Sequence, residues 1–277
     1  MGSRCVLIQS CWKYEQIGAS QAIRETWAPA LRAAGITVKF TVGDTESFDG
    51  LDLPKLAEVG TLDHMSAWHR AENPIGAFPL ADDVMVVSAP DGYMGSAWKR
   101  RASLRWALDE GFDWVFCGFP DTFIFPDRFI PFVPTPPCTG WKQSWYGIEF
   151  PQGGCGYFLD REGMEMFCRV PFETWSDDSH AGLALIRSGR TFYNETRFMS
   201  DPRDIDHMLE HRSITLHLAG RSHPYDPSVV YRAWNRSKNL PLPEWDGRCK
   251  TCGTFGNFRR GIRQDICCRE CQSTFYF

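Results

Sequence analysis

The 277-residue sequence predicts an α/β fold, a mostly parallel sheet flanked by helices, with a small extra module at the C-terminus. Three observations predict it. Short apolar, β-branched stretches alternate with helix-like stretches along the first half of the chain. Hydrophobic residues make up 43% of the chain, which is enough for one large core. Five of the eleven cysteines crowd into the last thirty residues, which is typical of a separate metal-binding unit.

The elements of the sheet are expected in regular order. A glycine ends each helix-like stretch, Gly35 the first and Gly111 the second. Residues 44–81 have no clear period and predict a surface excursion. Because strands alternate with helices, the sheet should be covered on both faces. In chain order we expect strands over 5–10, 36–43, 83–87 and 114–117, with helix-like stretches ending at Ala34 and spanning about 96–110.

The fourth of these strands ends at a Gly-Phe-Pro break, and a lone carboxylate, Asp121, follows the break. In open α/β sheets, a carboxylate at the carboxyl end of a strand faces the ligand crevice. Asp followed by Thr is also common turn chemistry, so Asp121 is either a site residue or a turn residue on this evidence.

Composition and charge narrow the class of protein. A net charge of −4 and a pI near 6.0 argue against wholesale wrapping of a polyanion, although they allow a local basic patch. No run of about 18 apolar residues and no signal-peptide pattern is present, which predicts a soluble protein without a membrane segment. The clustered cysteines favour a reducing compartment such as the cytoplasm over a secreted disulfide framework.

Five stretches then occur in the order and spacing of one family's motifs. They are Arg24-Glu25-Thr26-Trp27, Asp91-Gly92-Tyr93 with Lys99, Phe119-Pro120-Asp121 with Phe123 and Pro126-Asp127-Arg128, Gly153 to Leu159, and Asp177 to Gly182. Together they resemble the R-x-T-W, D-x-Y-x-N-L-T-x-K, D-D-D-x-F-x-x-P-D-R, S-G-x-G-Y-x-L-S and E-D-V-x-x-G motifs of glycosyltransferase family 31, the Fringe and beta-1,3-galactosyltransferase family. The resemblance spans roughly residues 5–220.

The resemblance implies a GT-A fold, which is Rossmann-like, and inverting transfer of a sugar from a UDP-sugar donor to an acceptor hydroxyl. It implies manganese or magnesium at the donor, held by Asp121 and by His217 at the end of an apolar stretch. It also implies that Asp178 is the general base. The residues that it places at the donor are Arg24, Asp91, Lys99, Asp121, Gly154 and Gly156.

The chain departs from the family at Phe119 and Pro120, which replace acidic residues and weaken the expected pull on a cation. Structural alternatives stay open elsewhere. A histidine on an apolar strand is often a core residue, and Asp177 and Asp178 could cap a helix. We expect Ser179 or Asp177 to cap it while Asp178 faces the site. The aromatic residues Trp141, Trp145 and Tyr146 either stack on an acceptor ring or belong to the core.

The C-terminal cysteines form two C-x-x-C pairs, Cys249 with Cys252 and Cys268 with Cys271, fifteen residues apart. This spacing predicts a four-thiolate Zn²⁺ site of the zinc-ribbon type, with Cys267 as a spare thiol and disulfides as the alternative. So small a module would depend on its metal for stability. The predicted organisation is a GT-A domain over 1–224, a Pro-rich linker over 225–245 and the ribbon over 246–277.

The composition of the predicted ribbon gives information on the acceptor. Residues 246–277 hold six Lys or Arg against three acids, interleaved with aromatic residues, a balance found both on nucleic-acid-binding ribbons and on structural caps. The acceptor is therefore predicted to be either a glycan or a hydroxymethylated base in DNA, the latter pointing to a phage or viral source. An alternative from another class is a catalytically decayed GT-A fold that binds nucleic acid through the ribbon.

Overall fold

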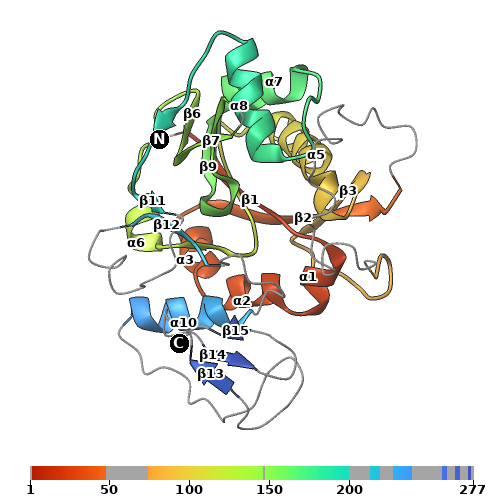
Figure 1. Cartoon of the computed structure of the whole chain (residues 1–277), viewed down its shortest axis with the longest axis vertical. Coiled ribbons are helices and arrows are strands. Elements are labelled where there is room, and N and C mark those ends of the chain that lie inside the picture. Colours follow the sequence, from red (N-terminus) through yellow and green to blue (C-terminus); the bar gives the residue numbers. More distant parts are fainter. Residues whose placement is uncertain are drawn as a thin grey trace.

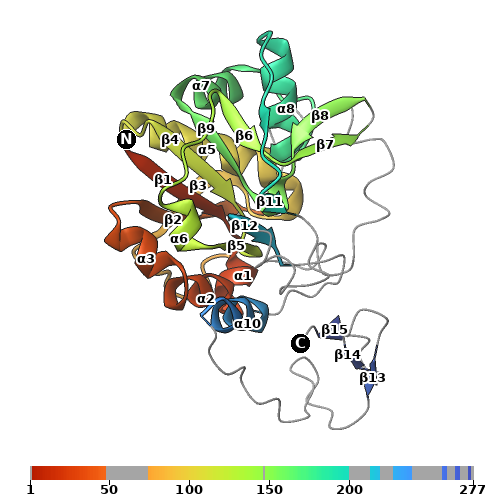
Figure 2. The same cartoon turned by 90° about the vertical axis from the view of Figure 1, so that its left-hand side faces the viewer.

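The computed structural model describes residues 2–47, 74–145, 147–199, 213–218 and 227–238, together with three short strands between 258 and 275. A seven-stranded sheet lies at the centre of the main body, and helices cover both of its faces (Figures 1 and 2). The irregular stretch expected from 44 to 81 lies mostly outside the described residues, apart from its two ends.

The central sheet has the order β10-β6-β9-β4-β1-β2-β3 and is mostly parallel. Only β9 runs antiparallel, to β4 on one side and to β6 on the other. The four strands predicted from the apolar stretches are confirmed as β1 to β4. The strands are β1 (Arg4–Gln9), β2 (Thr37–Thr45), β3 (Val84–Pro90), β4 (Trp114–Gly118), β6 (Cys138–Gly140), β9 (Tyr157–Asp160) and β10 (Tyr193–Asn194).

Two hydrophobic cores lie on opposite faces of this sheet, because successive residues of a strand point to opposite sides. In β1, Val6 and Ile8 belong to one core, whereas Cys5 and Leu7 belong to the other. The first core is covered by α1 (Trp12–Gln16), α2 (Ala19–Glu25), α3 (Ala28–Ala33) and α10 (Ser228–Ser237), and the second by α5 (Ser96–Asp109), α7 (Arg161–Arg169) and α8 (Asp177–Arg187) (Figure 1).

The strand order creates a switch point beside β1. The chain passes from β1 to β2 and β3 on one side, and then returns to place β4 on the other side of β1. Ligands of open α/β sheets bind at the carboxyl ends of the strands at such a point. A buried guanidinium ties the two ends together, since Arg100 donates to the carbonyls of Leu7 in β1 and Gly118 in β4, both at 3.0 Å.

A second, three-stranded sheet lies beside the carboxyl end of β4. It consists of β11 (Phe198–Met199), β12 (Thr215–His217) and β5 (Thr122–Ile124). In the antiparallel pair of β12 and β5, His217 lies opposite Thr122, and the Leu218 amide donates to the Asp121 carbonyl at 2.8 Å. This register brings a late segment of the chain directly against the residues that follow β4.

The structure differs from the predicted linker over 225–245, because α10 occupies residues 228–237. Val230 and Ala233 of this helix are buried in the first core, and Tyr231 donates a hydrogen bond to Glu25 of α2. Apolar side chains recur at helical spacing in this segment, whereas the prolines lie only outside it. Residues 228–237 of the predicted linker therefore form a helix that covers the core.

The remaining elements are short. They are the 3-10 turns η2 (Tyr93–Gly95) and η3 (Gly153–Cys155), helix α6 (Pro126–Phe129), the hairpin of β7 (Lys142–Trp145) and β8 (Ile148–Pro151), and the C-terminal strands β13 (Phe258–Arg260), β14 (Ile266–Cys268) and β15 (Thr274–Phe275). None of the described helices is long and apolar enough to cross a membrane.

The three C-terminal strands form a small antiparallel sheet in which Phe258 pairs with Cys268. Cys249, Cys252 and Cys271 lie outside the described residues, and Cys268 is described only as backbone at the end of β14. The zinc site therefore stays a prediction.

Candidate active site

The pair of Asp121 and His217 stands at the switch point. Asp121 follows β4, and His217 reaches it through the pairing of β12 with β5. The Nε2 atom of His217 lies 3.0 Å from Oδ2 of Asp121, and the two side chains are 24% and 19% exposed. Burial acts to lower the pKa of His217, but the charge and the hydrogen bond of Asp121, with a further contribution from Asp178, raise it above its ordinary value. The pair is thus partly exposed, and Asp121 makes the His217 ring more basic than a free imidazole.

A tight turn packs on the His217 ring. A Cβ atom at Gly154 would lie 2.6 Å from three atoms of the imidazole, so only glycine allows this approach. Thr122 fixes the turn by donating from its hydroxyl to the Gly154 carbonyl at 2.9 Å. On its other edge the ring faces Gln152, whose Nε2 is 3.5 Å from Nδ1 of His217. The imidazole is therefore held from three sides.

Asp178, in the first turn of α8, contacts the same turn from another side. Its Oδ2 accepts from the amide of Gly153 at 3.0 Å, and its Oδ1 accepts from the amide of Ser179 at 2.6 Å and from the hydroxyl of Ser176. Burial and the neighbouring charge of Asp177 raise the pKa of Asp178 to about 6, against the lowering effect of these hydrogen bonds. At neutral pH the carboxylate is ionised and is more basic than an ordinary aspartate.

The neighbouring carboxylate has a different task. Asp177 is buried and accepts from Nε of Arg100 at 2.9 Å, from the hydroxyl of Ser96 at 2.9 Å and from the hydroxyl of Tyr157 at 3.2 Å. Asp177 therefore does not cap α8, although Ser179 or Asp177 was expected to do so. The N-cap position is Ser176, whose side chain makes no capping bond. Asp177 instead holds Arg100 in place between the ends of β1 and β4.

Gly153 and Gly154 thus join the two acidic groups. One glycine donates to Asp178 and the next lies against His217, which itself contacts Asp121. Phe119, which stands where the family has an acid, packs on the same turn, since a Cβ atom at Gly153 would be 3.1 Å from its ring. The structure therefore gathers Asp121, His217 and Asp178 around one turn, and the roles that the resemblance implies for them stay predictions.

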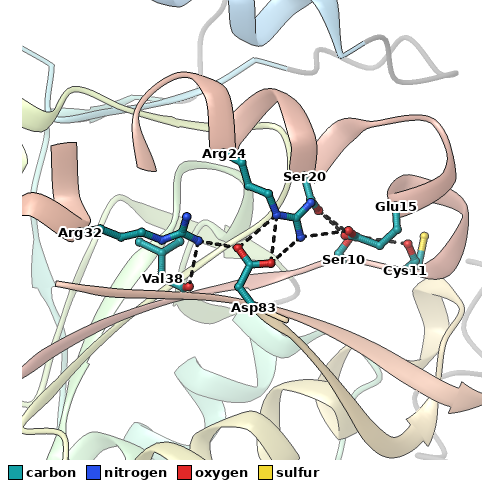
Figure 3. Close-up of polar contacts among 8 residues, drawn as sticks. All are labelled: Ser10, Cys11, Glu15, Ser20, Arg24, Arg32, Val38 and Asp83. Carbon is teal, nitrogen blue, oxygen red and sulfur yellow. Dashed lines mark hydrogen bonds and ion pairs between the residues drawn. The ribbon is translucent and has the colours of Figure 1, made fainter. Parts of the chain in front are cut away.

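Arg24, which was expected at the donor, lies in a separate charged cluster (Figure 3). Its Nη2 is 2.7 Å from Asp83 and 3.4 Å from Glu15, and its guanidinium stacks 4.4 Å from the centre of the Phe40 ring. Arg32 pairs with the other oxygen of Asp83. Among the contacts of the described residues, none joins Arg24 to Asp121 or His217.

Asp91 and Lys99 are also engaged within the fold. Asp91 is fully buried and accepts from the amides of Trp12 and Gly43 at 2.9 and 2.7 Å. Lys99 donates to the carbonyls of Ser10 and Asp91 at 2.7 and 2.6 Å. These bonds hold the carboxyl ends of β1, β2 and β3 together. Both residues therefore support the backbone beside the site, and their expected contact with a donor stays a prediction.

Gly156 likewise has a structural explanation. Its φ of +75° favours glycine, and a Cβ atom there would lie 2.1 Å from the Phe116 ring. Of the predicted aromatic acceptor residues, Trp141 packs partly buried against the first core. The side chain of Trp145 and all of Tyr146 lie outside the described residues.

A divalent cation fits the Asp121–His217 pair in part. Within the described ranges, no three His, Cys, Asp or Glu side chains lie close enough together to hold a metal ion. The two available donors, a carboxylate oxygen and an imidazole nitrogen, suit manganese or magnesium. Such ions commonly complete their coordination with substrate phosphates and water.

Sequence reasoning missed one feature beside Asp178. Tyr93 of η2 and Trp175 form a ring pair, with centroids 4.9 Å apart and an interplanar angle of 56°. The local signal was available, since Trp175 lies among polar residues two positions before Asp177. Nothing in the sequence, however, placed Tyr93 against it.

No protein-family model and no curated protein matches the chain. Among solved structures, it resembles a glycosyltransferase involved in glycosylation of the major capsid of PBCV-1, with a TM-score of 0.43 and 10% identity over 78% of this chain and 94% of that one. It also resembles the catalytic domain of Drosophila beta1,4-galactosyltransferase 7 in complex with xylobiose, with a TM-score of 0.43 and 9% identity over 99% and 92%. Both TM-scores lie below 0.5, and no function is assigned from them.

Proposed function

We propose that this chain is an inverting glycosyltransferase that moves a sugar from a UDP-sugar to an acceptor hydroxyl. The observation that carries the proposal is the single turn at Gly153 and Gly154, which contacts both Asp178 and the His217 of the Asp121–His217 pair. A basic carboxylate and a partly exposed pair that can meet a diphosphate therefore lie together at the switch point of the sheet, where ligands of open α/β folds bind.

In the proposed reaction, Asp178 accepts the proton of the acceptor hydroxyl. The hydroxyl oxygen attacks the anomeric carbon of the donor from the face opposite the diphosphate. As the new carbon–oxygen bond forms, the bond to the diphosphate breaks, and its electron pair leaves on the diphosphate oxygen. The raised pKa of Asp178 suits this task, because a base with a pKa near the working pH transfers protons most effectively.

The Asp121–His217 pair lies on the leaving-group side in this proposal. Asp121 and His217 would hold a manganese or magnesium ion, which supplies neutralisation of the negative charge that builds up on the diphosphate. Without a bound cation, a protonated His217 would instead donate a hydrogen bond to a phosphate oxygen. Phe119 and Pro120 replace the expected acids, so Asp121 and His217 are the two side chains that would hold the cation.

The test is release of UDP from a panel of UDP-sugars, with and without manganese and with and without oligosaccharides or hydroxymethylcytosine DNA. We expect slow release without acceptor and faster release with one of the two acceptor classes. In Asp178→Asn, acceptor-dependent release should fall at least about 1000-fold, within the range for loss of a general base. Asp127→Asn, at a carboxylate whose side chain is 67% exposed in α6, is the matched control.

Absence of UDP release from every donor would favour the alternative, a decayed transferase fold that binds nucleic acid. Wild-type turnover in Asp178→Asn would remove this residue as the base while leaving the transferase proposal to stand on the Asp121–His217 pair.

The C-terminal module is proposed to bind Zn²⁺ through Cys249, Cys252, Cys268 and Cys271. Support comes from the spacing of the two C-x-x-C pairs and from the short antiparallel strands around the second pair. Cys252→Ser should lose zinc, as measured by the metal content of the purified protein. Cys168→Ser, at a free thiol of the main body, should keep it. Equal zinc in both variants would refute the site.

A further inference from the structure

The Tyr93–Trp175 ring pair is a surface that the proposed mechanism does not use. Tyr93 is 46% exposed, although it lies in the short η2 turn that follows the buried Asp91. Its ring meets Trp175 at a centroid distance of 4.9 Å. A large aromatic side chain that remains half-exposed beside a catalytic carboxylate is typical of a ligand-binding surface.

Two hydrogen bonds fix this ring pair relative to Asp178. The amide of Ala97 donates to the carbonyl of Trp175 at 3.0 Å, and the hydroxyl of Ser96 donates to Asp177 at 2.9 Å. The start of α5, which follows Tyr93 directly, is therefore bound to the segment that leads into Asp178. A second aromatic contact, between Trp98 and Phe172 at 4.8 Å, holds the same two segments together.

The charges around the ring pair disfavour an anionic ligand. Trp175 lies two positions before Asp177 and three before Asp178. Burial and then the carboxylates of Asp178, Asp177 and Asp121 raise the pKa of the Tyr93 phenol. The cations among them are already engaged, since Arg100 pairs with Asp177 and His217 pairs with Asp121. A polyanion on this surface would meet the charge of Asp178, which neither of these cations balances.

We propose that Tyr93 and Trp175 form a binding platform for an uncharged sugar ring of the acceptor, and that this ring presents its hydroxyl to Asp178. A pyranose has an apolar C–H face that packs on aromatic rings and polar edges that form hydrogen bonds. This inference rests on the proposed transferase function and decides between its two acceptor classes in favour of a neutral glycan.

The experiment measures contact between the full-length protein and four neutral disaccharides, cellobiose, lactose, maltose and xylobiose, by saturation-transfer NMR in the presence of UDP. We expect at least one disaccharide to bind the wild type and to lose about tenfold in affinity in Tyr93→Ala. Tyr93→Phe, which keeps the ring, should bind as the wild type does. Tyr193→Ala, at a tyrosine that is 52% exposed on β10, is the matched control and should bind normally.

Kinetics provide a second measurement once an acceptor is turned over. Tyr93→Ala should raise the acceptor KM about tenfold and change kcat much less, because the platform binds the ring without taking part in proton transfer. Trp175→Ala should have the same effect. A thermal melt of each variant distinguishes weaker acceptor binding from unfolding.

Three results would overturn the platform. The first is unchanged disaccharide contact in Tyr93→Ala, and the second is no contact of any of the four with the wild type. The third is binding of single-stranded hydroxymethylcytosine DNA that depends on Tyr93 while the disaccharides do not. Failure of the transferase proposal is distinct, because it is detected as absence of UDP release, whereas loss of sugar contact in Tyr93→Ala supports the platform in either case.

Discussion

Two charged clusters of the main body differ in how their charges are balanced. The Arg24 cluster, formed by Arg24, Arg32, Glu15 and Asp83, sets two guanidinium groups against two carboxylates (Figure 3). The site around Gly153 and Gly154 sets one imidazole against the carboxylates of Asp121 and Asp178. The first cluster is matched, and the second has an excess of negative charge.

The pKa shifts follow this difference. Burial acts to raise the pKa of Asp83, but Arg24 and Arg32 lower it below its ordinary value. Burial and Asp177 raise the pKa of Asp178 to about 6. A matched carboxylate stabilises the fold, whereas an unmatched one is kept basic at the cost of stability, which is typical of active sites. The balance of charge, more than the number of charged residues, distinguishes a structural ion-pair cluster from a reactive group.

The largest expected effect comes from the unmatched site. Asp121→Asn removes the charge that faces the leaving diphosphate or its cation, so turnover should fall about 1000-fold. The melting temperature should change little, because the side chain is partly exposed. UDP release and a thermal melt measure the two quantities. A large loss of stability with normal turnover would show that Asp121 has a structural role, as Asp83 does.

Gly154→Ala should lower turnover about 100-fold, because the added methyl group displaces the His217 ring by about an ångström. The loss should appear in kcat and in manganese dependence. Gly92→Ala is the control, since a Cβ atom there meets nothing within 4 Å and the φ of −62° suits any residue. Equal activity of the two variants would show that the ring position does not matter.

Asp83→Asn should act on stability alone. Loss of the carboxylate leaves Arg24 and Arg32 without their shared partner and should cost about 2 kcal/mol at pH 7, measured by denaturant unfolding. Because the folded-state pKa of Asp83 is lowered, its contribution is present above the ordinary value of 3.8 and is lost as the pH falls through the folded-state value. UDP release should stay normal. A catalytic defect would show that the Arg24 cluster also contributes to activity.

The smallest effect concerns pH. Asp178 acts as a base only when ionised, so kcat/KM should fall as the pH drops through about 6, by tenfold per unit below that value. The same limb should be absent from the residual activity of Asp178→Asn. A wild-type limb near pH 4, the range of an unperturbed aspartate, would show that Asp178 is not the group being titrated.

The sequence predicted the central sheet well because its signal is local. Buried parallel strands are continuous apolar runs, as in β1 and β4, and the β-branched residues of β2 and β3 indicated the other two strands. Helix α10 was missed because prolines around it indicated a linker, while its buried Val230 and Ala233 depend on a surface that only the folded main body provides.

The site was predictable in part for the same reason. The position of Asp121 at the end of a strand is a local property, and Asp178 and His217 were selected through a resemblance in spacing. The contacts of Arg24, Asp91 and Lys99 were not predictable, since each has a distant partner, such as Asp83 for Arg24. The same holds for Tyr93 and Trp175, whose contact joins two segments 82 positions apart.

The pairing of β5 with β12 sets the order in which the proposed enzyme is completed. Asp121 and His217 are 96 positions apart in the chain, with Asp178 between them. During synthesis both carboxylates leave the ribosome before the imidazole does. A chain that stops short of residue 213 lacks the histidine that pairs with Asp121, so in the proposed enzyme donor cleavage would have to wait for synthesis of this late strand.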